Sequence, residues 1–198
     1  MFTLSLFIAC IVGLYFIVKN KEKTESGPSR PFDDLETKAV KQELTFPISE
    51  SNTIDQLVRK GFNHRKPTVF FDVDGVLHPN YDESLSNLPI LLNILNKNPN
   101  VQFIMSSSWR VDVDDNYLVN RFGIPFNLAL VGATPYGMKS RSDEITTFIK
   151  YYKIKKYIIL DDRKDLFHKK MDNIIFTDTN KGLTKKHEKM IFDWLGDK

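Results

Sequence analysis

The chain has 198 residues, of which 41% are hydrophobic and 12% aromatic, so it is long enough for one folded domain with an appended segment. Its single cysteine, Cys10, excludes a disulfide within the chain and a cysteine-rich zinc site. The formal net charge of +3 is unevenly distributed, since residues 67–138 carry −4 and residues 139–198 carry +5. The basic C-terminal third would attract a polyanion, although a solvated lysine-rich surface explains the same composition.

The N-terminal segment, residues 1–18, is apolar apart from Thr3 and Ser5 and is followed at once by lysines. Its length is at the short limit for a helix that spans a bilayer. It lacks a basic start and a small-x-small cleavage site, so we expect an uncleaved transmembrane helix rather than a signal peptide. The lysines after it predict a single-pass membrane protein whose following domain lies in the cytosol.

A polar stretch, residues 19–66, comes next and is expected to be a tether. It contains the breaker-rich sequence Ser26-Gly27-Pro28-Ser29-Arg30-Pro31. Two short helices are predicted inside it, one over residues 33–44 and one that begins at Asn52 or Thr53 and ends before Gly61. We therefore expect the folded domain to begin at residue 67.

Strand and helix patterns alternate from residue 67 to the C-terminus, which predicts a parallel sheet with helices on both faces. The predicted strands cover residues 68–73, 101–106, 127–131, 156–161 and 173–177. The predicted helices cover residues 84–97, 113–122, 140–152 and 184–195, and Pro89 favours a start of the first helix near that residue. The predicted fold class is therefore α/β, with one domain over residues 67–198.

Two aspartates, Asp72 and Asp74, end the first predicted strand, and Gly75 follows them. The alternation of a strand directs both carboxylates to the same side, at the end of the sheet where ligands of open α/β proteins bind. Two like charges in that place require a cation, and carboxylates without a nearby Cys or His favour Mg²⁺. An ordinary acidic turn after a strand is the alternative explanation.

Three further motifs follow in chain order. The strand over residues 101–106 runs into Ser106-Ser107-Ser108-Trp109-Arg110, Lys139 and Arg141 open a helix, and the strand over residues 156–161 ends in Asp161-Asp162. Together with the first motif, this order resembles the haloacid dehalogenase (HAD) superfamily over roughly residues 67–195. Within it, Ser107-Ser108-Trp109-Arg110 and Gly182-Leu183-Thr184 resemble the HAD domains associated with RNA-repair proteins. The resemblance implies a Rossmannoid three-layer sandwich without a large cap domain.

The resemblance also implies a phosphatase that works through an aspartyl-phosphate. Asp72 occupies the position of the nucleophile, and Asp74 occupies that of the acid that protonates the leaving oxygen and later activates water. Ser106 corresponds to the hydroxyl that binds a phosphoryl oxygen, with Ser107 as a second phosphate-binding residue. A shift of one or two residues would exchange Ser106 for Ser107 or Ser108.

A positive charge is expected beside the nucleophile. Arg141 is the favoured source because its guanidinium matches phosphate oxygens, and Lys139 is the alternative and a further phosphate-binding residue. For Arg110 the sequence leaves open a contact with phosphate or with an acidic residue, whereas Trp109 is expected to pack in the core. The four histidines form no spaced cluster and are expected to lie at the surface or to make minor contacts.

The resemblance implies Mg²⁺ as the cofactor of this site. The expected ligands are the Asp72 side chain, the Asp74 backbone carbonyl and Asp161, with Asp162 binding directly or through water. Because Mg²⁺ keeps some waters and binds phosphate oxygens, few protein carboxylates suffice.

The short spacing between the motifs predicts an open site. A helix fills most of the 31 residues between Asp74 and Ser106, and about ten residues separate Val131 from Arg141. Neither gap holds a cap domain, so we expect a large substrate that brings its own shielding from water.

The leading hypothesis is a membrane-tethered, Mg²⁺-dependent phosphatase whose substrate is a polynucleotide end, then a phosphoprotein, then a small phosphate ester, in falling order of preference. The alternatives are a non-catalytic HAD-fold module that recognises phosphate at a membrane, and a different HAD chemistry. Asp74 favours phosphate chemistry over dehalogenation. The sequence leaves the oligomeric state open.

Overall fold

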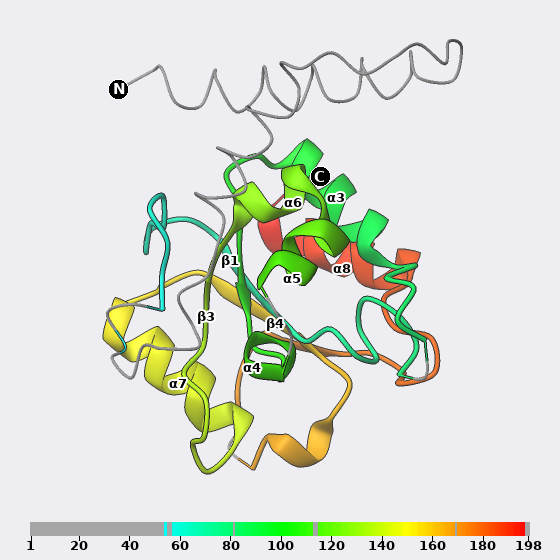
Figure 1. Ribbon diagram of the computed structural model, residues 1–198. Helices are drawn as coiled ribbons and strands as arrows, with labels where there is room; N and C mark the ends of the chain where they lie inside the picture. The colour runs from blue at the N-terminus through cyan, green and yellow to red at the C-terminus, as the bar shows by residue number, and fades with distance from the viewer. Residues whose placement is uncertain (1–53, 55–56, 81, 113–114, 169, 197–198) are drawn as a thin grey trace, which may run out of the picture. The chain divides into compact units, whose positions relative to one another are not determined.

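A computed structural model describes residues 54, 57–80, 82–112, 115–168 and 170–196 of the chain (Figure 1). Five parallel strands form one sheet in the order β3-β2-β1-β4-β5. The strands are β1 (Thr68–Phe71), β2 (Gln102–Met105), β3 (Leu130–Ala133), β4 (Tyr157–Asp161) and β5 (Ile174–Phe176). Nearly all their residues are buried, as expected of a parallel sheet covered on both faces.

Successive strand residues point alternately into two hydrophobic cores. Phe71 and Met105 face the first core, which is covered by α3 (Leu88–Lys97), α5 (Asp115–Phe122), α6 (Ile124–Ala129) and α8 (Lys185–Leu195). Phe70 and Ile104 face the second core, which α7 (Arg141–Tyr152) covers from the other side of the sheet (Figure 1). The prediction of an α/β fold with a parallel sheet is confirmed.

The register of the strands brings their carboxyl ends to one edge. Phe71 pairs with Met105 on one side and with Leu160 on the other. The backbone N–H of Asp72 donates to the Leu160 carbonyl at 2.9 Å, and that of Ser106 donates to the Phe71 carbonyl at 2.9 Å. The aspartates and serines of the predicted motifs therefore follow neighbouring strands at the same level.

The third strand differs from its prediction. Residues 124–129 form α6, and β3 begins at Leu130 rather than at residue 127. The buried side-chain amide of Asn127 donates to the carbonyls of Val119 and Gly123, both at 2.9 Å, which ties α6 to the end of α5. Phe126 packs against three other phenylalanine rings of the first core. These tertiary contacts outweigh the strand propensity of a short apolar run.

The packed part of the chain begins before residue 67, which corrects the predicted boundary. Leu57 is buried in the second core, and Val58 forms a bridge with Gly132. The Arg59 guanidinium donates to the Leu130 carbonyl at 3.1 Å. Residues 57–60 therefore run beside β3 rather than forming the end of the predicted helix.

The predicted anchor, residues 1–18, and the helix predicted over residues 33–44 lie outside the described residues. Within the described part of the chain, no helix has the length and apolar character needed to cross a membrane.

Candidate active site

Two aspartates and one arginine form the centre of the site. Asp72 follows β1 and Asp161 ends β4, and both carboxylates lie on the face of the sheet that α7 covers. Arg141 is the first residue of α7, and its Nη1 donates to Asp72 Oδ2 and, at 2.8 Å, to Asp161 Oδ2. The structure thus brings together three of the residues that the sequence selected from separate motifs.

Arg141 offsets the repulsion between the two buried carboxylates. Burial alone would lower the pKa of Arg141, but Asp72 and Asp161 more than offset it and raise the pKa above its ordinary value. Burial, and next the charge of Asp72, raise the pKa of Asp161, while Arg141 opposes the shift. The arginine therefore holds two buried carboxylates side by side.

A group of three carboxylates suits a hard cation. One oxygen from each of Asp72, Asp161 and Asp162 lies within 4.8 Å of the others. Asp162 lies against the backbone of Gly75, where a Cβ atom would come 2.3 Å from its Oδ2. Gly75 has a φ of +68°, and its carbonyl accepts a hydrogen bond of 2.6 Å from the Thr177 hydroxyl. Buried or half-buried oxygen donors of this kind fit Mg²⁺.

Asp74 is held in place by an aromatic residue. The Trp109 Nε1–H donates to Asp74 Oδ2 at 2.9 Å, and His78 Nε2 lies 3.4 Å from Asp74 Oδ1 without forming a hydrogen bond. Burial raises the pKa of Asp74, and the charge of Asp72 raises it further. Trp109 is buried in the first core, as predicted, and its contact with Asp74 was not predicted. His78, for which the sequence left a surface position or a minor contact open, is buried and lies against Asp74.

The structure distinguishes the three serines by their position. Ser106 and Ser107 are fully buried, and the Ser106 hydroxyl has no hydrogen-bond partner among the described residues. Ser108 instead lines the cavity at Asp72. The reason is that Ser106 still follows the line of β2, and the chain turns outward only as it enters α4 (Trp109–Asp112).

Lys139, the alternative to Arg141, is exposed and does not line the cavity. Arg110, which the sequence left undecided, is buried and pairs with Glu144 at 2.7 Å. Its guanidinium also donates to the carbonyls of four residues, namely Ser106, Ser107, Thr134 and Pro135. Arg110 therefore joins the ends of β2 and β3 to the first turn of α7, which carries Arg141.

A cavity of about 120 Å³ lies beside Asp72. Its lining residues are Asp72, Asp74, Asn80, Ser108, Arg141, Asp162, Arg163 and Leu166. Asn80 and Arg163 were not predicted, although Arg163 directly follows the Asp161-Asp162 motif in the sequence. The cavity has the size of a phosphate group rather than of a whole substrate.

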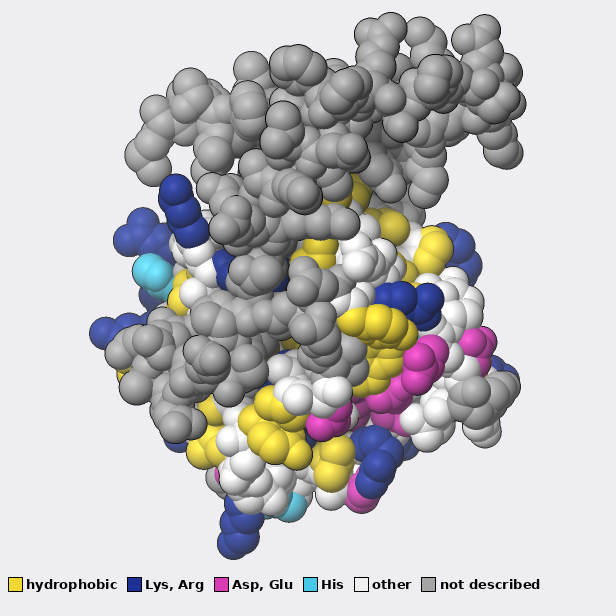
Figure 2. Space-filling view, viewed as in Figure 1, with side chains coloured by type: hydrophobic (Ala, Val, Ile, Leu, Met, Phe, Trp, Pro, Cys, Tyr) yellow, Lys and Arg dark blue, Asp and Glu magenta, His cyan; other side chains and the backbone are white. Residues whose placement is uncertain are grey.

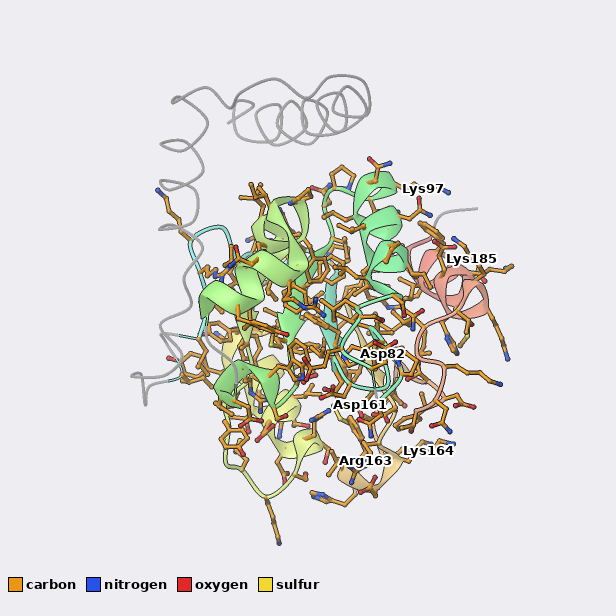
Figure 3. All side chains as sticks on the ribbon, turned by 45° about the vertical axis from the view of Figure 1, so that its right-hand side comes forward. Asp82, Lys97, Asp161, Arg163, Lys164 and Lys185 are labelled. Carbon is orange, nitrogen blue, oxygen red and sulfur yellow. The ribbon has the colours of Figure 1, made fainter. Side chains whose placement is uncertain are left out.

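The basic residues expected to attract a polyanion are spread over the molecule. Figure 3 shows Arg163 and Lys164 close to Asp161, whereas Lys185 and Lys97 lie toward the opposite end of the domain. Lys185 also pairs with Glu188 at 2.8 Å. Among the described residues, the basic contact that the turn after β4 offers near the cavity adds to that of Arg141, whereas Lys185 of α8 lies away from it.

The chain was compared with models of known protein families. The model of the HAD domain in Swiss Army Knife RNA repair proteins matches residues 68–187. The chain belongs to the HAD superfamily. Its HAD domain is of the kind associated with RNA repair, and membership indicates a phosphatase-type function. Neither the curated proteins nor the solved structures gave a significant match.

Proposed function

We propose that this HAD domain is a Mg²⁺-dependent phosphatase that removes a phosphoryl group through an aspartyl-phosphate on Asp72. The main support is that Asp72 and Asp161 both accept hydrogen bonds from one Arg141 nitrogen. Asp74 and Asp162 line the same cavity as Asp72 and Arg141. This arrangement supplies a carboxylate nucleophile, a charge that stabilises the transferring group, and an acid.

The first half of the reaction transfers the phosphoryl group to the enzyme. A carboxylate oxygen of Asp72 attacks phosphorus, and the bond between phosphorus and the leaving oxygen breaks. Asp74 gives its proton to that oxygen, and its raised pKa favours the protonated form required. Arg141 stabilises the charge on the phosphoryl oxygens.

The second half releases phosphate. Asp74, now ionised, takes a proton from a water molecule, whose oxygen attacks the phosphorus of the aspartyl-phosphate. The bond between phosphorus and the Asp72 oxygen breaks, which restores the carboxylate and leaves Asp74 protonated. Trp109 keeps the Asp74 carboxylate in one orientation through both steps.

Asp72, Asp161 and Asp162 would hold the Mg²⁺ ion, and the Asp74 backbone carbonyl remains a predicted fourth ligand. When bound, the ion supplies positive charge that neutralises the phosphoryl oxygens. Burial raises the pKa of Asp162, and the Thr179 hydrogen bond opposes that shift.

The favoured substrate is a phosphorylated polynucleotide end. Only α3 and its flanking loops separate β1 from β2 among the described residues, so nothing of cap size encloses the cavity there. The description of the family points to RNA repair proteins. We further propose that residues 1–18 anchor the domain to a membrane, on the basis of their apolar composition and the lysines that follow.

The test is a phosphatase screen with and without Mg²⁺, using 3′- and 5′-phosphorylated oligonucleotides, the matching mononucleotides and an aryl phosphate. Wild type should hydrolyse them only with the metal, and Asp72→Asn should not. Asp82→Asn is the matched control, because the Asp82 carboxylate accepts hydrogen bonds from Ser84 and is not among the residues that line the cavity. Hydrolysis by Asp72→Asn at the wild-type rate would contradict the proposal.

Oligonucleotides should exceed mononucleotides in kcat/KM by about tenfold at low salt, and the ratio should fall as salt rises. Replacing Arg163 and Lys164 by Gln should narrow the ratio, whereas Lys185→Gln should not, because Lys185 lies far from Asp161 (Figure 3). Equal kcat/KM values for the oligonucleotide and the mononucleotide would refute a polynucleotide as the substrate, but would not contradict the proposed phosphatase activity.

A further inference from the structure

A second hollow of about 500 Å³ adjoins the cavity at Asp72. Its lining residues are Asp74, Glu83, Ser108, Trp109, Asp112 and Tyr117. Two of them, Asp74 and Ser108, also line the first cavity, so the hollows meet at these residues. Because Asp74 gives its proton to the leaving oxygen in the proposed reaction, the group attached to that oxygen lies on the Asp74 side.

One wall of this hollow is aromatic. The rings of Trp109 and Tyr117 lie 6.1 Å apart between centroids and are tilted by 51°. Trp109 is fixed by its hydrogen bond to Asp74, and the Tyr117 hydroxyl donates to Glu83 Oε2 at 3.2 Å. Aromatic faces held in this way bind planar or apolar groups.

The other wall is acidic. Glu83 and Asp112 are exposed, and together with Asp74 they give three carboxyl groups around one hollow. Among the described residues, no Lys or Arg lines it, although the Arg121 guanidinium lies 5.8 Å from the centre of the Tyr117 ring. Figure 2 shows acidic side chains gathered beside hydrophobic ones on this face of the domain.

The two hollows therefore differ in charge. The first contains Arg141 and Arg163 beside Asp72, Asp74 and Asp162, and its two guanidinium groups attract the phosphoryl group. The second has no basic residue among its lining side chains, and the carboxylates of Glu83 and Asp112 accept hydrogen bonds, attract cations and repel anions. A leaving group that carries its own negative charge is disfavoured in the second hollow, and one with hydroxyl or amino donors is favoured.

We propose that this hollow binds the organic part of the leaving group, and that it selects a planar, uncharged or cationic group with hydroxyl or amino donors over an anionic one. This inference rests on the proposed phosphatase activity, since Asp74 defines the leaving-group side. A nucleoside meets these requirements. If it belongs to a polynucleotide, the neighbouring phosphate of that polynucleotide must turn away from Glu83 and Asp112.

The test uses three aryl phosphates that differ in the charge of one para substituent, aminomethyl, hydroxymethyl or carboxymethyl. The methylene keeps the acidity of the three phenols similar, so that differences in rate report binding rather than leaving-group chemistry. With Mg²⁺ at low salt, the full-length protein in mild detergent should hydrolyse the cationic ester about tenfold faster in kcat/KM than the anionic one. The preference should shrink at high salt.

Glu83→Gln combined with Asp112→Asn should reduce the cationic-to-anionic ratio to about twofold or less. Asp193→Asn is the matched control, because Asp193 lies on α8, is exposed and pairs with Lys189 instead. The control should keep the wild-type ratio. A wild-type ratio near one, or a tenfold ratio that survives in the double variant, would overturn the inference.

Binding of the three free phenols, followed by ligand-detected NMR, separates this inference from the proposed activity. 4-(Aminomethyl)phenol should bind wild type more tightly than the carboxymethyl analogue, and the double variant should lose the difference. If no ester is hydrolysed, the proposed function fails, while the order of phenol binding still decides whether the hollow has this selectivity. Equal binding of the cationic and anionic phenols would refute it.

Discussion

Replacing Arg110 by Met should strongly destabilise the domain. Arg110 is 3% exposed and donates to Glu144 and to backbone carbonyls at the ends of β2 and β3. Burial raises the pKa of Glu144 and Arg110 opposes the shift, so the carboxylate depends on its partner. Breaking a buried ion pair from one side costs about 3–5 kcal/mol.

That loss is a large part of a typical stability of about 5–15 kcal/mol, and for a domain of this size it lowers Tm by on the order of 10 °C. Glu144→Gln should cost less, about 1–2 kcal/mol, because Arg110 keeps its carbonyl acceptors. The assay is urea unfolding of both variants and of Arg65→Met, an exposed arginine that should change stability by less than about 0.5 kcal/mol. A cost below about 1 kcal/mol for Arg110→Met would refute the reasoning.

Three further predictions concern a glycine, a histidine and the N-terminal boundary. Gly75→Ala should weaken Mg²⁺ binding, measured by calorimetry, and should destabilise the domain more than Gly137→Ala does. Both glycines have a positive φ (+68° and +82°), but of the two only a Cβ atom at Gly75 would meet Asp162. Equal effects of the two substitutions would contradict this. Burial lowers the pKa of His187, whose Nδ1 accepts from the Thr184 N–H at the start of α8, so its contribution to stability is present above its unfolded pKa of about 6.5 and is lost as pH falls. The Tm difference between wild type and His187→Gln should therefore become less favourable to wild type between pH 7 and 5, and a difference that moves the other way would refute the assignment. A chain that begins at Asn52 should unfold like the full chain, whereas one that begins at Pro67 should be less stable by about 2 kcal/mol or more because it lacks the buried Leu57; equal stability of the two would place Leu57 outside the core.

The alternating pattern of the sequence predicted the sheet and most helices because buried parallel strands leave a strong signal. Pro89 marked the start of α3, which begins at Leu88, and the strand ends at Asp72 and Asp161 were predicted to within two residues. The start of the third strand was placed three residues too early because α6 depends on contacts of Asn127 and Phe126 with other segments. A local pattern carries no information on such contacts.

The site was predictable to the extent that topology decides it. Residues at the carboxyl ends of adjacent parallel strands must meet, and the start of the helix before β4 lies at the same end of the sheet. Side-chain contacts then select Arg141 over Lys139. The contacts of Trp109 with Asp74 and of Arg110 with Glu144 depend on side-chain geometry, so the sequence could not specify them. Three consecutive serines gave no local signal to separate the buried Ser106 from Ser108.

The most direct test of the central claim is to trap the phosphorylated enzyme. The protein is mixed with Mg²⁺ and a radiolabelled phosphate ester, quenched in acid during turnover, and digested for peptide mapping. The proposed mechanism predicts an acid-stable, hydroxylamine-labile label on the peptide that contains Asp72, and no label in Asp72→Asn. A label on another residue, or turnover without any labelled enzyme in wild type, would contradict the assignment of Asp72 as the nucleophile.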